Sequence, residues 1–384
     1  MSNIVIVADA ELGTSLSVIR ALSEYGLRVI SISKGKAGGY LSRFIWKKFD
    51  LSGLTDEEYV KSIIDIAKLE KVSAIFAHFE KTLLHLYEEI VKEDVSFKLI
   101  MPPLELFKFA IKKENVLLVA KELDIPVPET IYYNSNDNHD LCEIIEKRIP
   151  CFIKTTKEID IPPGPGNRYL LIKNKDDLRN LPEFIKKHDT LLVQEYIEGY
   201  GCGIAGVFYH GTPIVIGGHI RLRESFASGG VSTYCESKIH REALNYATKI
   251  MSKLKWSGIA MVEFKVTSQD IPYFMEINPR IWGTIPLYIA SGINIPVVAY
   301  EVFVNNCLNG FSNNFREGIK MRFLIEDLCA INQQYKGYKK LAEFIRVFLN
   351  IYKVKEGTFH IRDPLPFFVP IAYRVMKSMT RRLQ

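Results

Sequence analysis

The sequence predicts an α/β domain followed by a larger α+β region, and two observations support this division. Near the N-terminus, the β-branched run IVIVA at residues 4–8 precedes a helical pattern that ends at Gly26, and the strand-like LRVISIS follows. Such β-α-β units recur over about the first hundred residues, as expected of a doubly wound, Rossmann-like domain. From residue 151 onward, hairpin-like strands separated by turns predict antiparallel sheets.

The other elements are predicted from local spacing. Apolar residues at helical intervals predict helices at 59–69, 82–92, 104–123, 176–187 and 240–254. Apolar and β-branched runs predict strands at 73–77, 151–156, 168–172, 191–199, 258–266 and 272–280, with two more on either side of the turn at His210–Gly211. Pro102 and Pro103 mark a boundary. We therefore expect an α/β domain (1–103), a central region (104–310) and a helical C-terminal extension (311–384).

Composition limits the class of protein. The 384 residues are 47% hydrophobic and 24% charged, which excludes a disordered chain, a coiled coil and a collagen-like fibre. A net charge of +6 suits an anionic substrate but falls short of a nucleic-acid-binding surface. No apolar run reaches the roughly 18–20 residues that span a bilayer.

The six cysteines are scattered and form no C-x-x-C pair, which argues against a zinc site or a disulfide framework. No basic, leader-like segment opens the chain. These features predict a cytoplasmic protein in a reducing compartment.

The most informative residues lie in VEFK (262–265) and MEINPRIWG (275–283). A hairpin would place Glu263 and Glu276 on one face of a sheet, with Asn278 two residues further along that face. Two carboxylates and an amide oxygen are hard ligands that suit Mg²⁺. Arg280 continues the alternation and adds a cation. The alternative, two solvated acids on an exposed hairpin, is disfavoured because apolar residues flank EINPR.

Several segments, taken together, resemble the ATP-grasp superfamily of carboxylate–amine or carboxylate–thiol ligases. In chain order they are the N-terminal IVIVADAELGTSLSVIRALSEYGLRV, KKENVLLVAKELDIPVPET, FIKTT, LLVQEYIEG, HIRLRESFASGGVST, WSGIAMVEFK and FMEINPRIWG. EINPR after a VEF strand is fairly specific, whereas the other segments are weak singly. The resemblance implies an ATP-grasp fold at 104–310, with subdomains 104–190 and 191–310, after an N-terminal Rossmann-like (pre-ATP-grasp) domain.

The resemblance also implies a site for ATP between the two subdomains. By position, Lys113 and Lys154 would contact the phosphates, which suits two point charges. Gln194, Glu195 and Ile197 would form the hinge strand beside adenine, and Glu198 would contact the ribose. Glu263, Glu276 and Asn278 would hold Mg²⁺, with Mn²⁺ as a substitute, and Arg280 would lie near the transferred phosphate.

Arg221 and Arg223 alternate along a predicted strand before the glycine-containing SGGVST segment, so we expect them to share a face and to bind a substrate carboxylate or phosphate. A salt-bridged exposed strand explains them equally well. The stretch KEIDIPPGPGNRYLL departs from the family's glycine-rich phosphate loop, because its prolines stiffen it and remove amide donors.

The implied function is an ATP- and Mg²⁺-dependent ligase that joins a small-molecule or amino-acid carboxylate to an amine through an acyl phosphate, as in D-aspartate-ligase-like and carbamoyl-phosphate-synthase-like proteins. The alternatives are a nucleotide-binding regulatory protein without turnover and a phosphoryl transferase that stops at the acyl phosphate. Nothing in the residues selects the substrates, and a homodimer stays open.

For the C-terminal PLPFFVPIAYRVMKSMTRRLQ, a docked helix is favoured over peripheral membrane contact.

Overall fold

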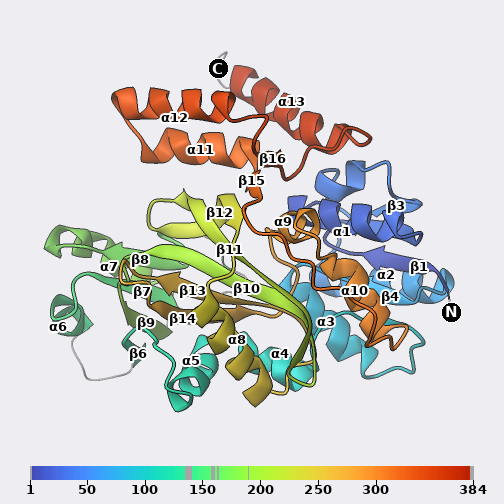
Figure 1. Cartoon of the computed structure of the whole chain (residues 1–384), viewed down its shortest axis with the longest axis horizontal. Coiled ribbons are helices and arrows are strands. Elements are labelled where there is room, and N and C mark those ends of the chain that lie inside the picture. The colour runs from blue at the N-terminus through green and yellow to red at the C-terminus, as the bar shows by residue number, and fades with distance from the viewer. Residues whose placement is uncertain (1, 135–140, 157–160, 162–163, 189, 381–384) are drawn as a thin grey trace.

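The computed structural model describes residues 2–134, 141–156, 161, 164–188 and 190–380. Within them the chain forms three β-sheets, and the C-terminal helices lie as a separate layer at one end of the molecule (Figure 1).

The N-terminal sheet is parallel, with strand order β3-β2-β1-β4-β5. Its strands are β1 (Ile4–Val7), β2 (Arg28–Ser33), β3 (Lys47–Asp50), β4 (Ala74–Phe76) and β5 (Lys98–Leu99). Its helices are α1 (Gly13–Glu24), the 3₁₀ turn η1 (Gly38–Leu41), α2 (Asp56–Leu69) and α3 (Glu80–Ile90). Alternate residues of the fully buried β1 enter two cores: Ile4 and Ile6 pack with α2 and α3, whereas Val5 and Val7 pack with α1. The predicted doubly wound domain is confirmed.

A small antiparallel sheet follows, with order β6-β9-β7-β8. Its strands are β6 (Thr130–Asn134), β7 (Cys151–Thr155), β8 (Tyr169–Ile172) and β9 (Thr190–Glu195). It is covered by α6 (Leu141–Glu146), η2 (Lys175–Asn180) and α7 (Leu181–Ile185). Ile153, Val193 and Phe184 lie in a core that belongs to this unit alone.

The large sheet has the order β14-β13-β10-β11-β12-β15-β16. Its strands are β10 (Tyr200–Tyr209), β11 (Thr212–Phe226), β12 (Gly229–Ser237), β13 (Gly258–Val266), β14 (Pro272–Asn278), β15 (Lys320–Arg322) and β16 (Lys355–Glu356). The helices packed on it include α8 (Arg241–Lys253), α9 (Ile285–Ala290) and α10 (Ile295–Phe303). One core joins Val262 and Ile204 to α8, while another joins Met261 and Ala205 to the N-terminal domain.

The helix predicted at 104–123 is in fact two helices, α4 (Leu104–Ala110) and α5 (Lys113–Glu122). Lys112 between them has an extended backbone. Tertiary packing explains the break, because Phe107 of α4 enters the core of the N-terminal domain whereas Val116 of α5 packs against the large sheet. No proline or glycine lies in this stretch, so local propensity could not reveal the interruption.

The C-terminal extension consists of α11 (Leu324–Gln334), α12 (Gly337–Leu349) and α13 (Leu365–Thr380). It also contributes β15 and β16 to the edge of the large sheet, so the region predicted to be helical contains strands as well. Among the described residues, no helix is long and apolar enough to cross a membrane.

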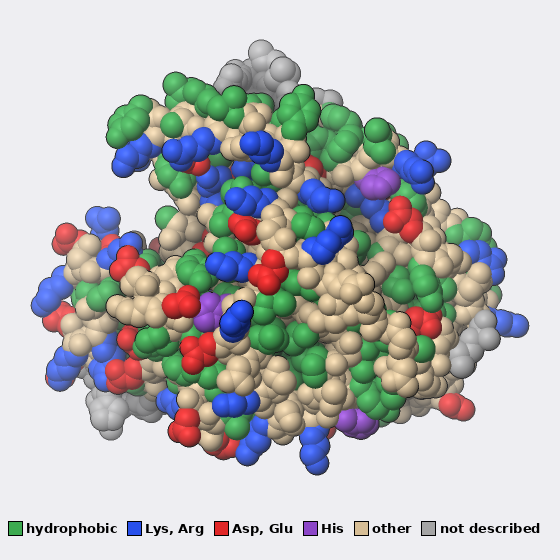
Figure 2. All heavy atoms as spheres, in the orientation of Figure 1, with side chains coloured by type: hydrophobic (Ala, Val, Ile, Leu, Met, Phe, Trp, Pro, Cys, Tyr) green, Lys and Arg blue, Asp and Glu red, His purple; other side chains and the backbone are tan. Residues whose placement is uncertain are grey.

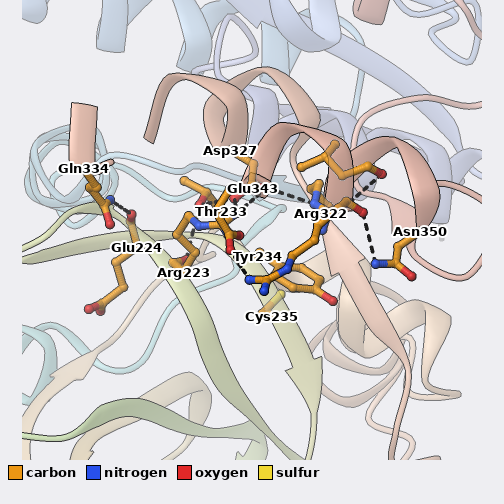
Figure 3. Close-up of polar contacts among 12 residues, drawn as sticks. Arg223, Glu224, Thr233, Tyr234, Cys235, Arg322, Asp327, Gln334, Glu343 and Asn350 are labelled. Atoms are coloured by element: carbon orange, nitrogen blue, oxygen red, sulfur yellow. Dashed lines mark hydrogen bonds and ion pairs between the residues drawn. The ribbon is translucent and has the colours of Figure 1, made fainter. Parts of the chain in front are cut away.

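Two buried carboxylates fasten this extension to the rest of the molecule. Asp327 of α11 is fully buried, and both of its oxygens lie 2.8 Å from Arg223 Nη1, with Arg322 Nε 2.9 Å away (Figure 3). Asp363, also buried, lies 3.0 Å from Arg20 Nε of α1 and accepts a hydrogen bond from Ser42 Oγ at 2.7 Å. A buried charge is costly unless it is paired and hydrogen-bonded, and both carboxylates meet that condition.

Candidate active site

The β13–β14 hairpin brings the predicted acids together. Glu263 and Glu276 are directly opposite each other in the register of the two strands. The Asn278 side-chain amide donates to Glu263 Oε1 at 3.1 Å and to Glu276 Oε1 at 3.4 Å. The sequence thus correctly predicted that these three side chains meet, because the period of a strand fixes which residues share a face.

Two cations from other elements pair with this acid cluster, which we define as Glu263, Glu276 and Asn278. Arg221 Nη2 of β11 lies 2.6 Å from Glu263 Oε1, and Lys113 Nζ at the start of α5 lies 2.9 Å from Glu276 Oε2. All four charged side chains are largely buried. Charge pairing offsets the cost of removing the two carboxylates from water.

A glycine makes room for the arginine. The Arg221 side chain passes Gly201 on β10, and a Cβ at position 201 would lie 2.7 Å from Arg221 Cδ. Beyond the glycine, Arg221 Nη1 also bonds Glu224 Oε1 and the Gly230 carbonyl, both at 2.9 Å. The guanidinium is therefore fixed from three sides.

The electrostatics separate the two carboxylates. Burial raises the pKa of Glu263. Arg221 acts to lower this pKa, but the nearby carboxylates of Glu276 and Glu224 raise it and so offset part of the effect of Arg221. Burial acts in the same direction on Glu276, but Lys113, Lys154 and Arg221 overcome it and hold the pKa of Glu276 below its ordinary value. Glu276 is thus the more firmly ionised member of the pair.

The small sheet supplies a second lysine. Lys154 Nζ of β7 donates to Gln194 Oε1 at 2.6 Å and lies 5.1 Å from the centre of the Phe152 ring. Gln194 is buried in β9, and its amide nitrogen donates to Thr130 Oγ1 at 3.0 Å. Because Lys154 also lowers the pKa of Glu276, the small sheet and the acid cluster are electrostatically linked.

The predicted hinge residues lie where the chain passes from the small sheet to the large one. Glu195 ends β9, and Ile197 and Glu198 lie in the connection to β10. Ile197 is buried, whereas the side chains of Glu195 and Glu198 are exposed. The backbone of Glu195 is tied to β6, since its N–H donates to the Glu129 carbonyl at 2.8 Å.

Arg280 and Arg223 bind partners outside the acid cluster. Arg280 Nε lies 3.0 Å from Glu80 Oε1 of α3, so this arginine joins the large sheet to the N-terminal domain. The Arg223 guanidinium pairs with Asp327 and with Glu343 of α12, the latter at 2.5 Å. Arg221 and Arg223 therefore have different partners, and a register shift in the β11–β12 pairing falls between them.

Two glycine-containing segments meet beside the site. Gly164 and Gly166 both have positive φ, and Gly164 lies against the Phe226 ring at the end of β11. Tyr169 Oη also lies 3.0 Å from Ser228 Oγ. Residues 157–160 and 162–163 of the proline-containing loop lie outside the described residues, so the prediction about its cover over the phosphates stays untested.

Three residues of this region were not singled out from the sequence. Glu224 pairs with Arg221 and, at 3.6 Å, with Lys265, and Glu80 holds Arg280. Glu224 immediately follows the alternating HIRLR, which was a usable signal. Glu80 comes from a distant helix, and Gly201 matters only for its missing Cβ, so neither carries a local signal.

The donor chemistry suits a magnesium ion. Glu263 and Glu276 offer carboxylate oxygens, and the Asn278 amide, whose nitrogen donates to both carboxylates, offers a further hard oxygen. Mg²⁺ prefers one or two carboxylates together with phosphate oxygens and water. The described part of the chain contains no cluster of three or more His, Cys, Asp or Glu side chains placed to hold a metal. A two-carboxylate site completed by a nucleotide is consistent with that finding.

Known proteins share this architecture. The sequence matches a family described as ATP-grasp in the biosynthetic pathway with Ter operon, over residues 187–324. Among solved structures, it is similar to the biotin carboxylase domain of Hydrogenobacter thermophilus 2-oxoglutarate carboxylase, solved with MgADP and bicarbonate, with TM-score 0.65, 17% identity and coverage of 83% of this chain and 73% of that one.

Two further structures point the same way. Campylobacter jejuni biotin carboxylase, in a complex with β,γ-ATP, has TM-score 0.65 and 18% identity over 82% of this chain and 74% of that one. The carboxyaminoimidazole ribonucleotide synthase of Aspergillus clavatus, in complex with ATP, has TM-score 0.62 and 15% identity over 83% and 80%. The fold is therefore that of the ATP-grasp enzymes.

Proposed function

We propose that this protein is an ATP- and Mg²⁺-dependent ligase that joins a carboxylate to an amine through an acyl phosphate. The observation that carries the proposal is the acid cluster, whose two carboxylates and amide are paired with Lys113 and Arg221 and lie within electrostatic reach of Lys154. This combination of hard oxygen ligands and fixed cations suits a triphosphate with its metal. The similar structures solved with MgADP and with ATP support it.

Each group has a definite role in this proposal. Glu263, Glu276 and Asn278 hold Mg²⁺, or Mn²⁺ in its place, and the ion supplies charge neutralisation at the phosphates. Lys113 and Lys154 bind phosphate oxygens as mobile point charges. Lys113 Nζ lies 2.9 Å from Glu276 Oε2 and exchanges that partner for phosphate when ATP binds.

The adenine and ribose are assigned to the connection between the two sheets. Backbone groups of Glu195 and Ile197 contact the adenine edge, and Glu198 contacts the ribose. Gln194, in β9, has an orienting role, because its side-chain oxygen accepts a hydrogen bond from Lys154 Nζ at 2.6 Å and so positions the lysine.

The chemistry proceeds in two balanced steps. An oxygen of the substrate carboxylate attacks the γ-phosphorus, the bond from that phosphorus to the β–γ bridging oxygen breaks, and ADP departs. The amine nitrogen then attacks the acyl carbon, the carbon–oxygen bond to phosphate breaks, and the phosphate leaves as the nitrogen gives up a proton. Arg280 stabilises the negative oxygen of the tetrahedral intermediate. Glu80 orients the arginine, because its Oε1 lies 3.0 Å from Arg280 Nε.

The two substrate arginines are assigned different parts. Arg221 lies at the acid cluster and remains our candidate for binding a substrate carboxylate or phosphate. For Arg223 we infer an anchoring role instead, because its guanidinium is held by the buried carboxylate of Asp327 and by Glu343. Substrate binding at Arg223 would leave Asp327 with one fewer cation.

The proposal is tested by ADP and phosphate release from MgATP against a panel of amino acids and dicarboxylates, with and without amines. We expect release that requires a carboxylate and an amine together and that disappears in Glu276→Ala. Glu242→Ala, an exposed acid on α8, is the matched control. Hydroxylamine trapping of the acyl phosphate distinguishes ligation from phosphoryl transfer alone. ATP binding without turnover across the panel would favour the regulatory alternative.

A further inference from the structure

The outer surface of the C-terminal extension is unusually apolar. Of the 23 large hydrophobic side chains exposed among the described residues, twelve fall within residues 338–369. On α12, Tyr338, Leu341, Ile345 and Phe348 recur at intervals of three or four residues and so form one face of the helix. Leu341 is 62% exposed and Phe348 63%. The opposite side of α12, at Val347, is buried.

This apolar face continues across the neighbouring segments. Figure 2 shows hydrophobic side chains gathered along the outer edge of the molecule, over α12 and α13. We define the apolar ridge by its exposed members, which are Tyr338, Leu341, Ile345, Phe348, Leu349, Ile351, Tyr352, Ile361, Leu365, Phe368 and Val369. Contiguous apolar surface of this kind on a folded chain marks an interaction site.

The same segment concentrates the positive charge of the protein. Residues 335–384 contain eleven lysines and arginines against three acids, a net charge of +8, whereas the whole chain carries +6. The rest of the molecule is therefore slightly acidic. Among the cations, Lys336, Lys339 and Lys353 are exposed and lie within two residues of Tyr338 or Tyr352 in the sequence.

The three acids of this segment are directed inward. Asp363 is buried against Arg20, and Glu343 pairs with Arg223. Glu356 accepts hydrogen bonds from the backbone N–H groups of Leu324 and Thr358. The three negative charges are thus paired within the protein, and the outer surface of the extension is positively charged.

The ridge is held in place before any partner arrives. Asp327 and Asp363 fasten the extension to the large sheet and to the N-terminal domain, so binding does not require the helices to fold. The ridge lies on the outer edge of the extension, whereas basic side chains border the hollow on its inner side (Figure 2). A flat partner on the ridge would leave that hollow open.

We propose that the apolar ridge docks on the surface of an anionic phospholipid bilayer. Aromatic and aliphatic side chains enter the interface while the flanking lysines meet the head groups, as in amphipathic helices that lie in the plane of a membrane. Charge favours this occupant over a second copy of the chain, since two ridges would bring two segments of +8 together. A C-terminal helix docked on the protein and a peripheral membrane contact were given as alternatives from the sequence. In this proposal both hold, because the extension is docked and its outer face contacts the bilayer.

The test compares binding of the full chain to two kinds of vesicle. One contains phosphatidylcholine with about 30% anionic phosphatidylglycerol, and the other contains phosphatidylcholine alone. We expect co-sedimentation with the anionic vesicles that weakens as salt rises. Leu341→Ser combined with Phe348→Ser should reduce partitioning at least about tenfold, and Lys339→Ala about fivefold. Leu69→Ser, which alters a residue on α2 that is even more exposed, should have no effect.

Thermal melting and circular dichroism establish that each variant is folded. The proposal is overturned if the wild-type chain does not bind anionic vesicles, or if the double variant binds as well as the wild type. It is also overturned if sedimentation velocity without lipid shows a dimer that the double variant abolishes, because that result assigns the ridge to a second copy.

Discussion

Lys113 at the start of α5 lies 2.9 Å from the carboxylate of Glu276 on β14. Removing this ammonium should raise the pKa of Glu276 and remove the phosphate contact that we propose for Lys113. We predict that Lys113→Met weakens MgATP binding at least about tenfold, the order expected for a lost charge-assisted contact. Isothermal titration calorimetry measures the affinity. Lys112→Met is the matched control, since Lys112 is adjacent and exposed; equal affinity in the two variants would remove Lys113 from the site.

The space above Gly201 is occupied by Arg221, whose Cδ would lie 2.7 Å from a Cβ at that position. Gly201→Ala should therefore displace a guanidinium that Glu263, Glu224 and Gly230 hold in place. We expect a loss of about 1–3 kcal/mol in the free energy of unfolding, as for overpacking in a core. Urea denaturation provides the measurement. Gly35→Ala, whose Cβ would meet its nearest neighbour at 3.9 Å, should be close to neutral.

Asp327 neutralises Arg223 and Arg322 where water cannot reach it. Asp327→Asn leaves two arginines short of a counter-charge, so we predict a loss of about 3–5 kcal/mol in the free energy of unfolding. The comparison is Glu93→Gln, which removes an exposed pair with Lys68 and should cost less than about 1 kcal/mol. Similar losses in the two variants, measured by urea denaturation, would show that the buried network is not an anchor.

Two buried histidines should make the protein sensitive to acid. Burial lowers the pKa of His78 to about 4 and that of His219 to about 3. In the unfolded chain both titrate near pH ~6.5. Between these values the unfolded state binds more protons, so the free energy of unfolding should fall as the pH is lowered from about 6.5 toward about 4.

His219→Gln isolates one of these contributions. The variant should flatten the pH dependence of the free energy of unfolding over the same window, by an amount of order 2–4 kcal/mol. Chemical denaturation at a series of pH values gives the slope. His85→Gln, at a half-buried position on α3, serves for comparison, and a slope unchanged in His219→Gln would contradict the prediction.

Local sequence patterns were enough to predict the doubly wound first domain, the antiparallel region and the meeting of Glu263, Glu276 and Asn278. These follow from the spacing of residues along single elements and across one hairpin, where strand period decides which side chains are neighbours. The predicted hairpin was recovered as β13 and β14, in a register that sets the two acids opposite each other.

Tertiary structure alone decided the rest. The helix at 104–123 breaks at Lys112 because its two halves bury residues in different cores. Arg223 binds Asp327 and Arg280 binds Glu80, and each of these pairs is separated by about a hundred residues or more. Local spacing cannot specify such partners, because burial of charge is settled only when distant elements pack and each buried ion must find its counter-ion.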